Sequence, residues 1–84
     1  MFYVYLIRSK KDGQLYFGST RDLVRRLREH DSGLVTSTKS RRPFVLIYYE
    51  AYRVESYARR REQQLKLRAN AFSQLKRRLR DSLM

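Results

Sequence analysis

The sequence contains no cysteine, and it has one histidine, one proline and three glycines among 84 residues. The lack of cysteine excludes a disulfide scaffold, a thiolate metal site and a cysteine nucleophile, and one histidine leaves little scope for imidazole metal chemistry. No apolar run approaches the ~20 residues that span a bilayer, and the start of the chain lacks the basic leader of a signal peptide. We therefore expect a cytoplasmic protein without a membrane partner, associated with the nucleoid if its source is prokaryotic.

Positive charge dominates what is present, with 20 Lys and Arg against 8 Asp and Glu and a formal net charge of +12. Such an excess creates a field that attracts polyanions and that salt screens. The basic residues are spread along the chain and do not form a terminal arm. The charge favours DNA as the partner and is also compatible with RNA, because phosphate contacts dominate binding to both.

The length suits one small hydrophobic core. Hydrophobic residues make up 42% of the sequence and aromatic residues 13%, well above the level of disordered chains. No linker, repeat or low-complexity tract marks a boundary. We expect a single domain over residues 1–84, with a motif-bearing core over about 1–68 and an amphipathic helix over about 70–83. The absence of a heptad repeat favours a monomer.

The first part of the chain predicts a β-hairpin. Residues 2–7 are apolar throughout and rich in aromatic and β-branched types, which is typical of a strand covered on both faces. Asp12-Gly13 is a hairpin turn signal. Residues 15–18 then form the returning strand.

The turn sets the register of this hairpin. If Asp12-Gly13 is a two-residue loop, Lys11 faces Gln14, and odd positions of the first strand oppose even positions of the second. Tyr5 and Gly18 are then expected on one face of the sheet, together with Tyr16.

A helix, a loop and a third strand follow the hairpin. Thr20 or Asp22 can cap the helix, and Gly33 is a suitable stop for it. Residues 34–43 carry turn formers and predict a loop. Residues 44–49 are again apolar and predict the third strand.

Two more helices complete the predicted fold. Glu55 or Ser56 opens the second helix, and Asn70 caps the third. The inward side of the second helix comprises Ala58, Arg61, Glu62 and Leu65, and the apolar stripe of the third comprises Phe72, Leu75, Leu79 and Leu83. The sequence therefore predicts an α/β (α+β) fold: a three-stranded mixed or antiparallel sheet flanked by about three helices, in the order β-β-α-β-α-α.

One ordered set of motifs resembles the GIY-YIG nuclease domain. It comprises Tyr3-Val4-Tyr5, Tyr16-Phe17-Gly18, Arg26 and His30 on the next helix, and Glu62 on a later one. The resemblance covers about the first sixty-eight residues. It is greatest to the small stand-alone members related to the amino-terminal nuclease module of the excision-repair subunit UvrC, over the segments YVYLIRSKKDGQLYFGST, DLVRRLREH, RRPFVLIYYEAY and ARRREQQLK.

The resemblance places the family's strand motifs on the hairpin. Tyr5 matches the tyrosine of the first motif, and Tyr16 and Gly18 match the tyrosine and glycine of the second. Tyr3 stands where the first motif has glycine, as it does in the small stand-alone members. A GIY-YIG-like fold is implied.

The resemblance also places the family's helical residues. Arg26 matches the helical arginine, and His30 lies one turn later at a position that the family fills with histidine or tyrosine. Glu62 matches the glutamate that holds the single divalent metal. Asn70 is the only later asparagine that could correspond to the family's late asparagine.

These residue types suit phosphodiester hydrolysis. A hard ion such as Mg²⁺, or Mn²⁺, needs only one carboxylate, waters and the substrate phosphate, so Glu62 could anchor it alone. Arg26 could stabilise negative charge on the phosphoryl oxygens. The attacking water needs a base, for which Tyr5 and Tyr16 are candidates and His30 is a third. A free tyrosine has a pKa of ~10, so a nearby cation must help.

Each of these residues also has a structural interpretation. Glu62 is within reach of Arg59 and Lys66 along its helix, so an ion pair is the alternative to metal binding. For His30, a favourable interaction with the dipole at the end of its helix is the alternative to a role in the active site. For the tyrosines, packing with a satisfied hydroxyl is the alternative to catalysis.

Further residues are expected to contact nucleic acid. They are Gly18, Arg25, Lys39, Arg41, Arg42 and Arg59, with Arg60 and Arg61 beside the last. A solvated basic face is the alternative for all the charged ones. The sequence contains no zinc finger or basic zipper, so we expect recognition of backbone structure more than of base sequence.

Three hypotheses of function remain at this point. The first is a Mg²⁺- or Mn²⁺-dependent DNA endonuclease or nickase that acts in repair, recombination or processing. The second is a non-catalytic DNA- or RNA-binding module with the same fold. The third uses the apolar stripe of the last helix to dock a protein partner.

Overall fold

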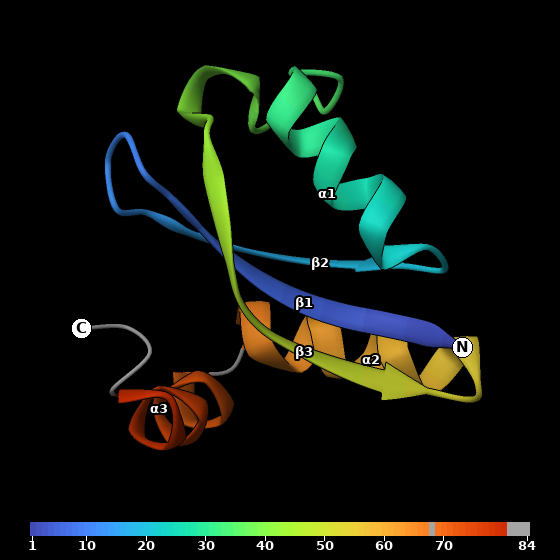
Figure 1. The fold of residues 1–84 in the computed structure, drawn as a ribbon. Coiled ribbons are helices and arrows are strands. Elements are labelled where there is room, and N and C mark those ends of the chain that lie inside the picture. The colour runs from blue at the N-terminus through green and yellow to red at the C-terminus, as the bar shows by residue number, and fades with distance from the viewer. Residues whose placement is uncertain (68, 81–84) are drawn as a thin grey trace.

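The computed structural model describes residues 1–67 and 69–80 of the chain. Its elements are, in order, β1 (Phe2–Ser9), β2 (Leu15–Thr20), α1 (Leu23–Ser32), the short 3-10 helix η1 (Lys39–Arg41), β3 (Phe44–Tyr52), α2 (Glu55–Leu67) and α3 (Ala69–Arg78). The predicted order β-β-α-β-α-α is confirmed (Figure 1).

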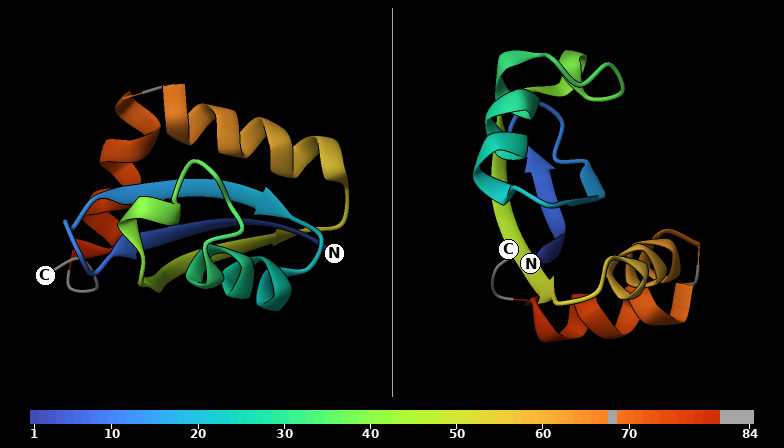
Figure 2. Two further views of the ribbon diagram at one scale, coloured as in Figure 1. Left: turned by 90° about the horizontal axis from the view of Figure 1, so that it is seen from above. Right: turned by 90° about the vertical axis from the view of Figure 1, so that its right-hand side faces the viewer.

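The three strands form one antiparallel sheet in the order β2-β1-β3. The first strand is therefore the central one. Figures 1 and 2 show α1 on one side of this sheet and α2 with α3 on the other. The alternation of side chains along each strand thus divides the residues of β1 and β2 between two different environments.

The hairpin register differs from the predicted one by two residues. Tyr5 pairs with Gly18, and Arg8 pairs with Leu15, so the expected pairing of Lys11 with Gln14 is wrong. A shift of two residues leaves each side chain on its original face. Tyr5, Gly18 and Tyr16 therefore do share one face, as predicted.

The cause of the shift is a longer loop than Asp12-Gly13. The amide of Ser9 donates to the carbonyl of Gln14 at 2.9 Å, which closes a loop over residues 10–13. Inside it, the Ser9 hydroxyl accepts from the amides of Lys11 and Asp12 at 3.0 and 3.2 Å. Gly13 has a φ of 74° and supplies the left-handed residue of this turn.

The main core lies between the sheet and the two later helices. It contains Val4, Leu6 and Phe17 from the strands and Ala58, Leu65 and Leu75 from the helices. Phe72 and Leu79 pack against the same cluster. The apolar stripe of α3 is thus occupied within the chain as far as Leu79, and Leu83 lies outside the described residues.

The ends of α1 follow the predicted capping signals. Asp22 is the N-cap, and its side chain accepts from the amide of Arg25 at 3.1 Å. Gly33 ends the helix with a φ of 81°, and its amide donates to the carbonyl of His30 at 3.3 Å. These caps fix the direction in which α1 leaves the end of β2.

The remaining boundaries differ in detail from the predicted ones. β2 continues to Thr20 and β3 to Tyr52, since both strands remain paired with β1 over their extra residues. The predicted loop over residues 34–43 contains η1. The prediction that Asn70 caps the third helix is wrong, because α3 begins at Ala69 and Asn70 lies inside it. Residue 68 alone separates α2 from α3. None of the described helices has the length and apolar character needed to cross a membrane.

Candidate active site

Tyr5 lies at the centre of the candidate site and is almost completely buried, with 1% of its surface exposed. Its ring lies over Gly18 of the neighbouring strand, where a Cβ atom would overlap the hydroxyl and Cζ of the tyrosine. Gly18 is itself buried. Its contribution in this structure is therefore the space that it leaves for the Tyr5 ring.

His30 connects Tyr5 to the loop after α1. The Tyr5 hydroxyl lies 2.7 Å from Nε2 of His30, and Nδ1 of His30 lies 2.7 Å from Oγ1 of Thr38. The Thr38 hydroxyl donates to the carbonyl of Val35 at 3.4 Å, so its oxygen accepts from Nδ1–H. Nε2 of His30 is then the acceptor, and the Tyr5 hydroxyl donates to it.

The protonation of this chain of groups follows from burial. Burial raises the pKa of Tyr5 to about 12, although the nearby Arg26 guanidinium opposes this rise. Burial, together with the charge of Arg26, lowers the pKa of His30 from its ordinary value of 6.5. Tyr5 and His30 are therefore both neutral at pH 7, which agrees with the hydrogen-bond directions given above.

Arg26 lies beside this chain of groups, on the side of α1 that faces the end of β2. Its Nη1 donates to Oε1 of Glu29 at 3.0 Å, and its guanidinium also interacts with the Tyr5 hydroxyl. Although partial burial acts in the other direction, these two partners raise the pKa of Arg26. The side chain is 36% exposed, so a fixed positive charge is accessible from solvent.

Tyr16 contacts the same histidine from β2. Its ring lies edge-on to the His30 ring, with the two centroids 5.2 Å apart. The ammonium of Lys66, near the end of α2, lies 5.5 Å from the centroid of the Tyr16 ring. Unlike Tyr5, Tyr16 is only partly buried. It is thus the tyrosine of the pair that reaches the surface.

Glu62 approaches the site from the other layer, past the edge strand β2. Its Oε1 accepts from the hydroxyl of Ser19 at 3.0 Å, and its Oε2 lies 3.1 Å from Nζ of Lys66. Arg59 pairs with Glu55 at 3.7 Å and not with Glu62. Lys66 therefore lies between the Tyr16 ring and the Glu62 carboxylate. Its ion pair with Glu62 was an alternative given by the sequence, whereas its contact with Tyr16 was not predicted.

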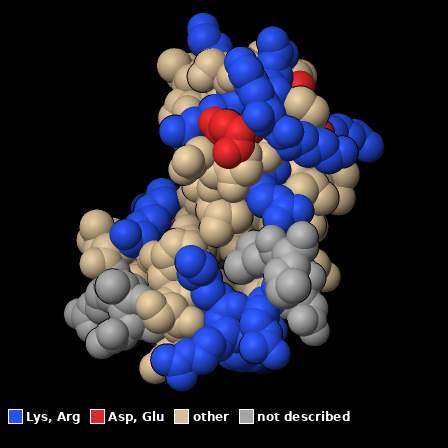
Figure 3. All heavy atoms as spheres, turned by 90° about the vertical axis from the view of Figure 1, so that its left-hand side faces the viewer, with Lys and Arg blue, Asp and Glu red and all other residues tan. Residues whose placement is uncertain are grey.

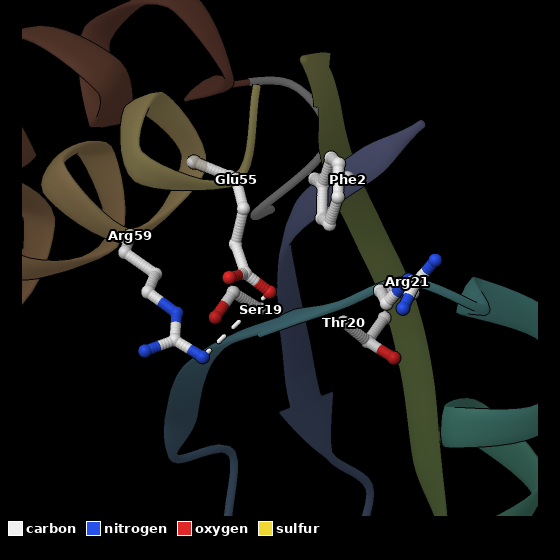
Figure 4. Close-up of a pocket in the computed structure, with 7 residues that line it drawn as sticks. Phe2, Ser19, Thr20, Arg21, Glu55 and Arg59 are labelled. Atoms are coloured by element: carbon white, nitrogen blue, oxygen red, sulfur yellow. Dashed lines mark ion pairs between the residues drawn. The ribbon is translucent and has the colours of Figure 1, made fainter. Parts of the chain in front are cut away.

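Two neighbouring pockets lie on either side of the end of β2. One, of about 310 Å³, lies against α1 and is lined by Arg25, Arg26 and Glu29 among others. The second, of about 210 Å³, lies against α2, and there the side chains of Glu55 and Arg59 extend toward Ser19 (Figure 4). Both pockets share Ser19, Thr20 and Arg21. The structure thus brings Arg25 and Arg59, two of the predicted nucleic-acid contacts, beside the candidate site.

The other predicted contacts lie elsewhere. Lys39 is exposed on η1, and Arg41 pairs with Asp12 of the hairpin loop at 3.7 Å. Arg42 lies next to Gly33, where a Cβ atom would approach its Nη1 to 2.6 Å. None of these three residues lines the two pockets at the end of β2.

Arg61 is engaged within the fold. Its Nε donates to Oε1 of Glu50 at 3.0 Å and its Nη2 to Oε2 at 3.1 Å, which is a two-point contact. The hydroxyls of Tyr48 and Tyr52 donate to the same carboxylate at 2.8 and 2.6 Å. Together these bonds lower the pKa of Glu50 although burial acts to raise it. Arg61 therefore connects α2 to β3.

The sequence matches the model of the GIY-YIG catalytic domain over residues 1–80. The chain belongs to the GIY-YIG family. A GIY-YIG domain is a nuclease-type domain, which implies a nucleic acid as its substrate. The resemblance found in the sequence is thereby confirmed.

Relatives of this GIY-YIG domain occur in several bacteria. A UPF0213 protein of Staphylococcus haemolyticus is 42% identical over 65 residues, which cover 76% of this chain and 78% of that protein. One of Desulfotalea psychrophila is 40% identical over 67 residues, which cover 77% and 60% of the two chains. The solution NMR structure of a UPF0213 protein from Bacillus halodurans is 37% identical, with a TM-score of 0.55 over 89% of this chain and 82% of that one.

Glu62 is the carboxylate in this GIY-YIG domain that suits a divalent metal. Within the described residues, no group of three or more metal-ligating side chains is present. Mg²⁺ or Mn²⁺ can bind through one carboxylate because these ions complete their coordination with water and substrate oxygens, and here Ser19 and Lys66 already contact the two oxygens of Glu62. The donor set thus fits a hard ion held mainly by the substrate and solvent.

Sequence reasoning missed one residue of this arrangement and one contact of another. Thr38 orients His30 from a loop of mixed Ser, Thr and Lys residues, and no local pattern distinguishes it from its neighbours. Helical spacing did place Lys66 within reach of the Glu62 carboxylate, but it could not place the ammonium over the Tyr16 ring. The side chain of Asn70 lies outside the described residues.

Proposed function

We propose that this GIY-YIG domain is a divalent-metal-dependent DNA endonuclease or nickase that hydrolyses phosphodiester bonds. The observation that carries the proposal is the cluster around the Tyr5 hydroxyl. His30 and Arg26 interact with this hydroxyl directly. The Tyr16 ring contacts His30, and the Lys66 ammonium lies between the Tyr16 ring and the Glu62 carboxylate. Groups from β1, β2, α1 and α2 thus meet at one place, with the chemistry that phosphodiester cleavage requires.

Tyr16 and Tyr5 have different roles in this proposal. Tyr5 is buried, and burial raises its pKa to about 12, so it is unsuited to accept a proton near neutral pH. We assign it the positioning of His30 and Arg26. Tyr16 is partly exposed and can release its own proton to solvent, and we propose that its phenolate then takes the proton of an attacking water.

Arg26 supplies the fixed positive charge. Its guanidinium is held by Glu29 on one side and Tyr5 on the other, so little reorganisation is needed when a phosphate binds. It also borders the pocket between β2 and α1. We propose that it stabilises the negative charge that develops on the phosphoryl oxygens.

Glu62 would hold the metal, Mg²⁺ or Mn²⁺, with Ser19 supporting one carboxylate oxygen. When bound, the metal supplies Lewis-acid polarisation of the phosphoryl oxygen and stabilisation of the leaving oxygen. Lys66 is paired with the other oxygen of Glu62 and must share it or move aside. From its position between Glu62 and Tyr16, its ammonium can then bind a substrate phosphate.

The substrate preference proposed is for DNA structure more than base sequence. The two pockets at the end of β2 carry arginines, which contact phosphates without reading bases. Such recognition suits branched or nicked DNA in repair, recombination or processing, and RNA offers the same phosphates.

Two matched pairs of variants test this function. Supercoiled plasmid and labelled branched DNAs are incubated with Mg²⁺, Mn²⁺ or a chelator. Glu62→Gln and Tyr16→Phe should lower cleavage by about 10²–10⁴-fold while DNA binding persists. Gln63→Lys and Tyr57→Phe alter exposed residues of α2 that line neither pocket and should cleave like the original protein. Gln63→Lys raises the net charge by one unit, as Glu62→Gln does.

A second function is supported by one specific observation. Both carboxylate oxygens of Glu62 already have partners in the chain, Ser19 and Lys66. A non-catalytic DNA- or RNA-binding module could retain these contacts for stability alone. Such a module would bind the same DNAs in chelator, yield no product with any metal, and lose stability in Glu62→Gln.

A further inference from the structure

A second basic groove lies at the hairpin end of the sheet, away from α1. It has a volume of about 700 Å³, and the side chains that line it include Arg8, Lys10, Leu15, Val45 and Lys76. None of the candidate catalytic residues lines it. The groove is therefore distinct from the two pockets at the end of β2.

The floor of this groove is a row across the sheet. Arg8 of the central strand pairs with Leu15 on one side and with Val45 on the other. Alternation along β1 places Arg8 on the same face as Val4 and Leu6, which the later helices cover. The row continues that face toward the hairpin loop, where it lines a groove.

The walls of the groove are held in place by the fold. The ammonium of Lys76 lies 5.4 Å from the centroid of the Phe72 ring on the same helix, a cation–π contact. On the hairpin side, the amide of Lys10 donates to the carbonyl of Pro43 at 2.8 Å. Lys10 and Lys76 are both exposed, so their charges face solvent from two separate elements.

The charged side chains described in the lining of the groove are all basic. They are Arg8, Lys10 and Lys76, and no acidic side chain of the described residues lines it. Figure 3, which faces the hairpin end of the molecule, shows Lys and Arg side chains above and below uncharged surface, with an acidic patch among the upper basic side chains. A concave surface lined by cations is complementary to a chain of phosphates.

The groove and the candidate active site lie on opposite faces of β2. Leu15, on its floor, precedes Tyr16, whose ring lies on the opposite face of the same strand. Because β2 is an edge strand, a polyanion can pass around it from one face to the other. One nucleic-acid molecule can therefore contact both surfaces.

We propose that this groove binds the sugar–phosphate backbone of the nucleic-acid substrate outside the cleavage site. The inference rests on the proposed function only in taking nucleic acid as the substrate. Lys10 and Lys76 contact phosphates there, and Leu15 and Val45 lie beneath the sugars. The groove thus extends the footprint of the domain beyond the scissile phosphate.

The test compares two double variants that remove the same charge. Lys10→Gln/Lys76→Gln alters the groove, and Arg28→Gln/Arg53→Gln alters exposed arginines that do not line it. Binding to a fluorescently labelled 30-base-pair DNA is measured by anisotropy in chelator between 50 and 200 mM salt. The groove variant should bind about tenfold more weakly, and its log–log salt slope should fall by about 0.9 for each lost contact. The control variant should change less than twofold.

Binding of the same variants to labelled poly-glutamate is measured alongside. Three outcomes would overturn the proposal. They are equal weakening of DNA binding in both double variants, no weakening in either, or a groove variant that loses binding to poly-glutamate but not to DNA. The last result would identify an acidic peptide as the occupant. Because chelator prevents cleavage, the assay is independent of catalysis, and the groove can fail while metal-dependent cleavage by the original protein stands.

A second measurement avoids substitutions altogether. Amide signals of the original protein are followed by NMR during titration with the same DNA in chelator. Leu15 and Val45 should shift together with Lys10 and Lys76. Shifts confined to the end of β2 and the start of α1 would contradict the proposal.

Discussion

Gly18 lies directly opposite Tyr5 on the neighbouring strand, and the Tyr5 ring occupies the space where a larger residue would carry its side chain. The hydroxyl of Tyr5 is thereby placed where it donates to His30 and interacts with Arg26. The glycine thus acts on the site indirectly, through the position of one ring. Gly18 contributes no reactive group, and this relationship explains why glycine is needed at its position in the motif.

Gly18→Ala should therefore displace Tyr5. The added methyl group overlaps the hydroxyl and Cζ of a fully buried ring, and such overpacking costs about 1–3 kcal/mol. Urea unfolding would measure the loss. Gly13→Asn is the matched control, since its Cβ meets nothing within 4 Å and asparagine tolerates the φ of 74°. Equal losses in the two variants would contradict this interpretation of Gly18.

Tyr5→Phe should lower stability, whereas Tyr16→Phe should lower turnover. Removing the Tyr5 hydroxyl leaves Nε2 of His30 as a buried acceptor without its partner, at a cost of about 1–3 kcal/mol. None of the hydrogen bonds described involves the hydroxyl of the partly exposed Tyr16, so Tyr16→Phe breaks none of them. Thermal unfolding and plasmid cleavage of both variants separate the roles. A fully stable Tyr5→Phe protein with no turnover would reverse the assignment.

Stability should fall as the pH drops below about 6.5. The pKa of His30 is lowered in the folded protein by burial and by Arg26, so the unfolded chain takes up the proton first. Protonation below the unfolded pKa then favours unfolding, with a slope of at most about 1.4 kcal/mol per pH unit.

Urea titrations between pH 7.5 and 5.5 would measure this slope. The window lies above the range in which Glu29 and Glu50 protonate, because the pKa of each is lowered from 4.5. His30→Gln should be less stable at every pH and should flatten the slope in this window. A slope unchanged by the substitution would assign the pH dependence to another group.

Arg61→Ala should destabilise the domain without weakening its binding of DNA. The substitution leaves the Glu50 carboxylate, whose side chain is 14% exposed, without its cationic partner. We expect a loss of about 1–3 kcal/mol, typical of an abandoned charged partner. Arg60→Ala, at the exposed neighbouring position, should stay within about 0.5 kcal/mol of the original protein. Weaker DNA binding by a fully stable Arg61→Ala protein would identify a phosphate contact instead.

Local signals were sufficient for the order of elements and for the caps of α1. The hairpin loop was misjudged because its length depends on the Ser9 hydroxyl, which binds two amides of the loop and lengthens it by two residues. The face shared by Tyr5 and Gly18 was still predicted, since a shift of two residues does not change which side a side chain occupies.

Partners that come from distant segments could not be predicted. The sequence left His30 with two interpretations, because neither Tyr5 nor Thr38 is near it along the chain and only the fold brings them within 2.7 Å. Arg61 looked like its neighbours Arg59 and Arg60. Only the packing of α2 against β3 assigns it to Glu50.

The central position of β1 has a consequence for how the domain is made. β1 is synthesised before both of its neighbours, yet it completes its pairing only once β3 has formed. The candidate site then also needs Glu62 and Lys66 from α2. A growing chain, or a fragment that ends before α2, therefore lacks part of the site. Any nuclease activity would thus arise only late in synthesis, when almost the whole domain has been made.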